Sequence, residues 1–248
     1  MPYSNGVAFY YDLFRQAEEP PDEAAEFLRD LVVSGERVLD IGAGTGTVAF
    51  ELAKQGALVT ALEPDNEMYG VMLARLAAQH ELAKHVTPIF GAAGFQLKSR
   101  FDLCVCFSVL HLLSPEKQTA LIIYARDRIK EGGRIIFDVP MRSSERVAKS
   151  WSVTATRELG DLRVEHHSAL EQTTGESWLT HWKFVEVLGG TVVREVTRTF
   201  RWQPLTHERS ENLLLANGLD LVQDYSGYGR GVYEVGRSRN RLVVARAT

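Results

Sequence analysis

The sequence has little cysteine, no long apolar run and no surplus of positive charge. Only two cysteines occur in 248 residues, Cys104 and Cys106, and both stand in one apolar run. Their position excludes a disulfide framework and favours a reducing compartment. No apolar stretch approaches the roughly 20 residues that span a bilayer, and residues 1–12 lack the basic and apolar regions of a signal peptide. We therefore expect a cytoplasmic protein with no membrane partner.

The charge balance argues against a nucleic-acid partner. Lys and Arg together number 28, and Asp and Glu number 32, which gives a formal net charge of −4. Binding to a phosphate backbone depends on a surplus of basic side chains. A basic excess occurs only locally, in residues 190–248, where 9 Lys and Arg stand against 6 Asp and Glu. The sequence therefore predicts no nucleic-acid partner and leaves an anionic small molecule open.

From residue 37 to 139, short apolar runs alternate with longer amphipathic segments. This alternation is typical of a parallel sheet with helices on both faces. Pro115 suits the first position of the last helix, and Gly132-Gly133 is expected to end it. The expected strands are 37–41, 57–62, 86–90, 102–107 and 134–139, and the expected helices are 22–33, 47–55, 67–83 and 115–130.

The pattern changes after Pro140. Segments 161–172, 178–188 and 191–202 alternate polar and apolar residues and are separated by turn glycines, which predicts a small antiparallel meander. A helix at 207–217, a strand at 219–225, a Gly-rich loop at 226–236 and a last strand at 241–246 are expected to follow. We therefore predict one domain made of residues 1–140 and 205–248, with residues 141–204 as an antiparallel cap inserted after the fifth strand.

The segment V-L-D-I-G-A-G-T-G at residues 38–46 marks a turn from a strand into a helix. Its three glycines allow a sharp turn and close approach of a ligand, and the next helix offers free N–H groups. Glu63 stands at the end of the second strand, where a carboxylate can accept hydrogen bonds from both ribose hydroxyls. These residues predict a nucleoside lying across the carboxyl ends of the first two strands.

The spacing of the glycines separates two kinds of nucleoside site. It is G-x-G-x-G, whereas nicotinamide and flavin enzymes carry G-x-G-x-x-G. Asp40 precedes the first glycine, and a carboxylate there repels a pyrophosphate but attracts an ammonium group. A nicotinamide-dependent oxidoreductase remains the alternative.

These residues resemble those of the class I S-adenosylmethionine-dependent methyltransferases, particularly the small-molecule type. The resemblance covers residues 35–140 and 205–246. It implies a Rossmann-like, seven-stranded, mostly parallel sheet in the order 3-2-1-4-5-7-6. It also implies S-adenosylmethionine as cofactor, S-adenosylhomocysteine as product, and methyl transfer to N or O of a small-molecule acceptor. A non-catalytic S-adenosylmethionine-binding protein is a second alternative, and a homodimer is left open.

The resemblance also implies roles for single residues in holding the cofactor. The glycine segment would pass beneath the methionine part, and Glu63 would hold the ribose. The family often has an Asp after the third strand, but residues 91–95 contain no acid, so backbone groups, Gln96 or Phe95 would contact the adenine. The cofactor-binding residues expected are Asp40, Gly42, Ala43, Gly44, Glu63, Pro64, Asp65, Met68, Ala92, Ala93, Phe107 and Ser108.

For the acceptor side, His111 and Tyr11 are the catalytic candidates. His111 follows the fourth strand and is either a base or a polar residue at a helix start, while Tyr11 belongs either to a packed N-terminal helix or to a lid. The acceptor pocket is expected between the N-terminal segment, His111, the inserted strands and the Gly-rich loop. The substrate-binding candidates are Arg142, Tyr228, Arg230 and Tyr233.

The remaining candidates for chemistry are expected to be structural. Cys104 and Cys106 lack two further ligands for a metal and are expected to be buried and inert. Asp138 alone does not form the acidic cluster of a metal-dependent enzyme, so no metal is expected. The three histidines of the inserted strands are expected to be exposed or capping residues: His166, His167 and His181.

Overall fold

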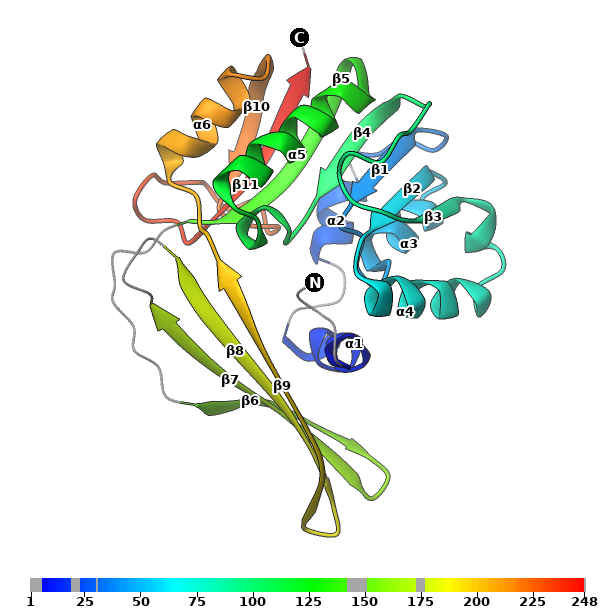
Figure 1. Ribbon diagram of the computed structural model, residues 1–248. Helices are drawn as coiled ribbons and strands as arrows, with labels where there is room; N and C mark the ends of the chain where they lie inside the picture. Colours follow the sequence, from blue (N-terminus) through cyan, green and yellow to red (C-terminus); the bar gives the residue numbers. More distant parts are fainter. Residues whose placement is uncertain (1–5, 19–22, 30, 142–150, 173–176, 248) are drawn as a thin grey trace.

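The computed structural model describes residues 6–18, 23–29, 31–141, 151–172 and 177–247 (Figure 1). In this part of the chain a seven-stranded sheet and a four-stranded sheet are connected in sequence, with the smaller sheet inserted between β5 and α6. Figure 1 shows the smaller sheet beyond one edge of the larger one, with α1 between them.

The larger sheet has the strand order β10-β11-β5-β4-β1-β2-β3. Neighbouring strands from β5 to β3 are parallel, and β11 runs antiparallel to both β5 and β10. The predicted order 3-2-1-4-5-7-6 and the Rossmann-like fold class are therefore confirmed. The strands are β1 Arg37–Ile41, β2 Leu58–Glu63, β3 Val86–Phe90, β4 Phe101–Cys106, β5 Ile129–Pro140, β10 Leu219–Tyr225 and β11 Asn240–Ala247.

Helices cover both faces of this sheet. On one face Phe27 of α2, Phe50 of α3 and Met72 of α4 form a core cluster with residues of β1 and β2. On the other face Leu121 of α5 and Leu213 of α6 contribute to a second cluster, and Figure 1 draws both helices in front of the sheet. No described helix is long and apolar enough to cross a membrane. The α-helices are α1 Val7–Glu18, α2 Glu23–Arg29, α3 Thr47–Lys54, α4 Asn66–Ala77, α5 Pro115–Arg128 and α6 His207–Leu215.

Three predicted helix ends are wrong. The helix predicted at 22–33 ends at Arg29. The helix predicted at 67–83 ends at Ala77, and a short 3-10 turn, Leu82–Lys84, follows it. The helix predicted to end at Gly132-Gly133 ends at Arg128, and β5 begins at the next residue. Arg100 explains this early end, because its guanidinium donates to the carbonyls of Asp127 and Ile129 (3.2 Å each) and satisfies acceptors that a helix end exposes.

The inserted sheet is an antiparallel meander in the order β6-β7-β8-β9. Three of its strands match the predicted segments, but the first was missed. Most of its side chains are exposed, and Arg157 interrupts the alternation of Val153, Ala155 and Leu159 with polar residues, so the pattern of a half-buried strand is weak. The strands are β6 Ser152–Leu159, β7 Leu162–Gln172, β8 Trp178–Leu188 and β9 Thr191–Trp202.

Helix α1 packs on the inserted sheet and also reaches the glycine segment. The ring of Tyr10 stacks on Phe184 at 4.7 Å, and Phe14 belongs to the same core cluster. On its other side, Asp12 accepts hydrogen bonds from the Thr45 hydroxyl (2.6 Å) and from Arg75 (2.9 Å). The helix therefore connects the loop after β1 to the inserted sheet.

A buried arginine joins the last three elements of the chain. Arg241 on β11 is only 1% exposed. Its guanidinium donates to Asp224 of β10 (2.8 Å), to Glu211 of α6 and to the Ser210 hydroxyl (2.5 Å). A buried charge costs free energy unless it is paired and hydrogen-bonded, and all three nitrogens here have acceptors.

Replacing this arginine should destabilise the fold. We expect Arg241→Met to lower the free energy of unfolding by about 3 kcal/mol, because two carboxylates lose their counter-charge. Urea unfolding followed by circular dichroism measures the change. The matched control is Arg246→Met, an exposed arginine on the same strand, which should shift stability by no more than about 0.5 kcal/mol. Equal effects of the two substitutions would contradict this role for Arg241.

Candidate functional site

The three glycines after β1 have different surroundings. A Cβ on Gly42 would lie 2.3 Å from the Val109 side chain, and one on Gly46 would lie 2.8 Å from Phe50. A Cβ on Gly44 would meet no atom of the described residues within 4 Å. All three have positive φ, but only Gly44 faces open space. The structure therefore assigns two glycines to internal packing and leaves one position where a ligand can approach the backbone.

Glu63 ends β2 directly beside Gly44. One of its carboxylate oxygens accepts a hydrogen bond from the Gly44 N–H (2.7 Å), and the other accepts from the Asp65 N–H (2.7 Å). The side chain is 6% exposed. Burial raises the pKa of Glu63 to about 7, although both backbone N–H groups act in the opposite direction. Because each oxygen retains a lone pair, the carboxylate can accept further hydrogen bonds from ligand hydroxyls.

The other cofactor-binding candidates lie around this pair. Asp40 is buried on β1. Asp65 caps α4 by accepting from the N–H groups of Glu67 and Met68, so its carboxylate is used within the fold. Two candidates, Ala92 and Ala93, lie in the loop after β3. The remaining candidates are in the segments after β1, β2 and β4: Gly42, Ala43, Pro64, Met68, Phe107 and Ser108.

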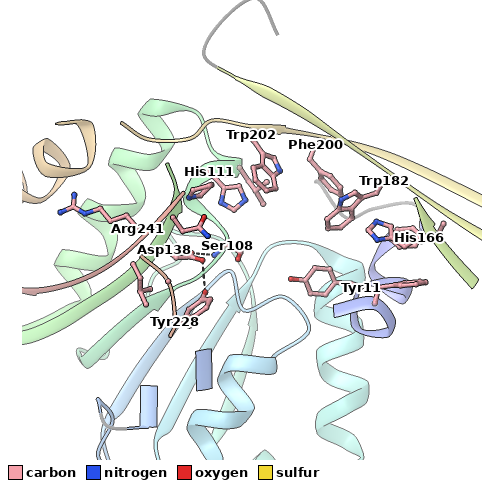
Figure 2. A pocket seen from close by; sticks show the side chains of 17 residues that line it. Tyr11, Ser108, His111, Asp138, His166, Trp182, Phe200, Trp202, Tyr228 and Arg241 are labelled. Carbon is pink, nitrogen blue, oxygen red and sulfur yellow. Dashed lines mark hydrogen bonds between the residues drawn. The ribbon is translucent and has the colours of Figure 1, made fainter. Parts of the chain in front are cut away.

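A cavity of about 440 Å³ lies next to these loops (Figure 2). It is bordered by α1, the segment after β4, the end of β5, the start of β11, the inserted sheet and the Gly-rich loop. The N-terminal segment, His111, the inserted strands and the Gly-rich loop are the parts where the acceptor pocket is expected. The lining residues are Tyr11, Phe14, Ser108, His111, Leu112, Asp138, Pro140, His166, Trp182, Phe184, Phe200, Trp202, Gly227, Tyr228, Asn240, Arg241 and Leu242.

One wall of the cavity is aromatic and comes from the inserted sheet. Trp182 packs edge-on against Phe200 at 4.7 Å, and His166 stacks on Phe184 at 4.8 Å. His166 is 5% exposed, so its predicted exposed position is wrong. Sequence reasoning missed this wall, although one signal was present: the aromatic residues of β8 (Trp178, Trp182 and Phe184) and those of β9 (Phe200 and Trp202) are spaced by even numbers of positions, which places them on one face of each strand.

The opposite wall is polar. Asp138, near the end of β5, accepts hydrogen bonds from the Ser108 N–H (2.5 Å) and from the Tyr228 hydroxyl (2.9 Å). Figure 2 shows these three residues together, across the cavity from Trp182 and Phe200. The sequence analysis considered Asp138 only as part of a metal cluster and missed this contact, because 90 residues separate the two side chains.

His111 borders both walls. It lies in a 3-10 turn, Leu110–Leu112, with its ring 4.7 Å from that of Trp202. Its carbonyl accepts from the Gln203 N–H (2.6 Å), which ties the segment after β4 to the end of β9. Burial lowers the pKa of His111 to about 4, and its Nδ1 has no hydrogen-bond partner among the described residues. At neutral pH the imidazole is therefore uncharged.

The substrate-binding candidates do not all reach the cavity. Tyr228 lines it, whereas Arg230 places its guanidinium over the ring of Phe27 (5.4 Å) and donates to the Phe27 carbonyl (3.0 Å). Tyr233 is not a lining residue, and its ring lies 4.9 Å from the Arg241 guanidinium. Arg142 lies outside the described residues.

Comparison with known proteins identifies the class. Residues 39–135 match the family model described as a methyltransferase domain. A putative methyltransferase of Geobacillus sp. (strain WCH70) is 32% identical over 143 residues, which cover 53% of this chain and 55% of that protein. The chain spans about half or less of the first curated relatives it matches.

Solved structures extend the likeness to the whole fold. The CcbJ methyltransferase from Streptomyces caelestis covers 100% of this chain and 98% of its own, with a TM-score of 0.81 and 24% identity. CalS10, an amino pentose methyltransferase from Micromonospora echinaspora solved with bound S-adenosylmethionine, covers 97% of both chains with a TM-score of 0.75 and 20% identity. Together, the family model over residues 39–135, the curated relatives and the shared fold support a methyltransferase of the class I S-adenosylmethionine-dependent family.

The raised pKa of Glu63 should make stability depend on pH. Its ordinary pKa is 4.5 and its folded value about 7, so between these pH values the folded protein binds more protons than the unfolded chain. Stability therefore falls as pH rises through this window. We expect the free energy of unfolding of Glu63→Gln, relative to that of the wild type, to rise by about 2–3 kcal/mol from pH 5 to pH 8. Urea unfolding at both pH values measures this, and a constant difference would refute it.

Proposed function

We propose that the protein transfers a methyl group from S-adenosylmethionine to a nitrogen or oxygen of a small-molecule acceptor. The observation that carries this proposal is the pairing of Glu63 with Gly44 at the sheet edge that also carries the cavity. A buried carboxylate with lone pairs to spare lies next to the one glycine of the segment that faces open space. The same sheet edge carries the acceptor-sized cavity, as expected for a ligand site of an open α/β sheet.

In this proposal the residues around β1 and β2 hold the cofactor. Glu63 accepts hydrogen bonds from the ribose hydroxyls, and the open backbone at Gly44 lies beneath the cofactor. Asp40, buried one residue before the turn, supplies a negative charge for an ammonium group. When bound, the cofactor supplies an electrophilic methyl group on a sulfonium.

The cavity supports a small acceptor. Its volume of about 440 Å³ lies within the usual range for small-ligand sites, and it combines an aromatic wall with a polar one. Such a site suits a ring with an apolar face and a polar edge. The amino pentose named for CalS10 is an acceptor of this kind, and we extend that chemical class to this chain as part of the proposal.

The chain's own contribution is alignment and exclusion of water. Correct alignment of two reactants is worth on the order of 7–11 kcal/mol. We propose that residues 141–204 act as a cap for this purpose, since β8 and β9 supply the aromatic wall. His111, uncharged at neutral pH, can accept a hydrogen bond from the attacking group, and Tyr11 faces the same cavity from α1.

The cofactor assignment predicts a binding defect. We expect Glu63→Gln to weaken S-adenosylmethionine binding about tenfold or more, because a neutral amide accepts hydroxyl hydrogen bonds less well than a carboxylate. Isothermal titration calorimetry measures the affinity. The control is Glu51→Gln, a glutamate on α3 that pairs with Lys54, which should leave the affinity within about twofold.

Two outcomes would favour the alternatives. Binding of NAD in place of S-adenosylmethionine would overturn the proposal in favour of an oxidoreductase. Binding of S-adenosylmethionine without transfer to a broad panel of amines and alcohols would favour a non-catalytic binding protein. Mass spectrometry of methylated products from the panel, and of small molecules released from the purified protein, identifies the acceptor class.

A further inference from the structure

The Asp138 cluster is distinct from the residues that hold the ribose side of the site. It consists of Asp138, Ser108 and Tyr228, which come from β5, the segment after β4 and the Gly-rich loop. Tyr228 is fixed at both ends: its hydroxyl donates to Asp138 (2.9 Å), and its ring packs edge-on against Phe107 at 5.5 Å. Ser108 has a φ of 57°, a strained value for a residue other than glycine, and its N–H is held by the same carboxylate.

This cluster lies between the glycine segment and the cavity. Val109, the residue after Ser108, lies so close to Gly42 that no Cβ would fit there. In the sheet, β1 separates β2 from β4, so a ligand that extends from Glu63 across the glycine segment meets the residues after β4 next. Ser108, Asp138 and Tyr228 also line the cavity. On the proposed function, the cluster therefore borders the region where donor and acceptor would meet.

The chemistry of the cluster favours a cation. Asp138 supplies a carboxylate, and Phe107 and Tyr228 supply aromatic rings, which attract positive charge. The positive charge of Arg241, which also lines the cavity, is balanced by Asp224 and Glu211.

We infer that Asp138 and Tyr228 are specificity-determining residues that favour the methyl donor over its demethylated product. S-adenosylmethionine carries a positively charged sulfonium, whereas S-adenosylhomocysteine has a neutral thioether in its place. The two molecules are otherwise alike, so a carboxylate and aromatic rings near this atom strengthen binding of the donor alone. This inference rests on the proposed function. It gives the chain a way to release product in the presence of fresh donor.

The test compares the affinities of both molecules by calorimetry, which needs no acceptor and no turnover. We expect Asp138→Asn to weaken S-adenosylmethionine binding about fivefold or more while S-adenosylhomocysteine binding stays within about twofold. Tyr228→Phe keeps the ring and removes only the hydroxyl. The ratio of S-adenosylmethionine affinity to S-adenosylhomocysteine affinity should therefore fall by a smaller factor than in Asp138→Asn. This second variant also serves if Asp138→Asn does not fold.

Two control variants test whether a change in the ratio of donor affinity to product affinity is specific to the Asp138 cluster. Asp102→Asn makes the same change at the opposite end of β4, where Asp102 pairs with Lys130, and should alter neither affinity. Glu63→Gln should weaken both ligands equally, because both carry the ribose. Equal losses for donor and product in the Asp138 and Tyr228 variants, or no loss, would overturn the inference. Failure of the wild-type protein to bind either molecule would instead overturn the proposed function.

Discussion

The site depends on one constraint, the parallel arrangement of β2, β1, β4 and β5. Parallel neighbours end at the same edge of a sheet, so residues distant in sequence meet there without any local signal that pairs them. Glu63 ends β2, the glycine segment follows β1, Ser108 follows β4 and Asp138 lies near the end of β5. The chain enters the inserted sheet from this edge, and α1 packs on that sheet through the contact of Tyr10 with Phe184. Each group assigned to binding or chemistry is therefore within reach of the same edge.

Local patterns in the sequence predicted most of the strands and the glycine segment, because both depend on residues close together in the chain. The sheet order came from the resemblance to a known family. The aromatic wall was harder to foresee, since it forms only when α1 and the carboxyl edge of the large sheet meet the inserted strands. His166 illustrates this: alone on a polar strand it suggests exposure, but its partner Phe184 lies on the neighbouring strand and buries it. The contact between Asp138 and Tyr228 is even harder to predict from the sequence, because a tertiary contact across 90 residues leaves no periodic pattern.

The glycine segment shows why a motif alone does not locate a ligand. Three glycines at alternate positions suggest one shared role. Two of them are needed for packing, however, because a Cβ there would clash with the side chains of Val109, Phe50 or Met72. Such glycines make the turn possible. Gly44 is different because none of the residues that the structure describes occupies the space where its Cβ would lie. The distinction depends on contacts that only the folded chain provides, and it narrows the expected approach of a ligand from a segment to a single position.

The buried ionisable groups of Arg241 and Glu63 differ in how far the fold compensates the cost of their burial. Arg241 is surrounded by two carboxylates and a hydroxyl, so its burial is compensated within the chain and it holds α6, β10 and β11 together. Glu63 is nearly as buried, but the hydrogen bonds to its carboxylate come from two backbone N–H groups, and its raised pKa reports the uncompensated part of the desolvation. A ligand that offers two hydroxyl donors would supply what the fold leaves out. The costly carboxylate is therefore better explained by binding than by stability, because the same position filled by a neutral residue would make the free protein more stable.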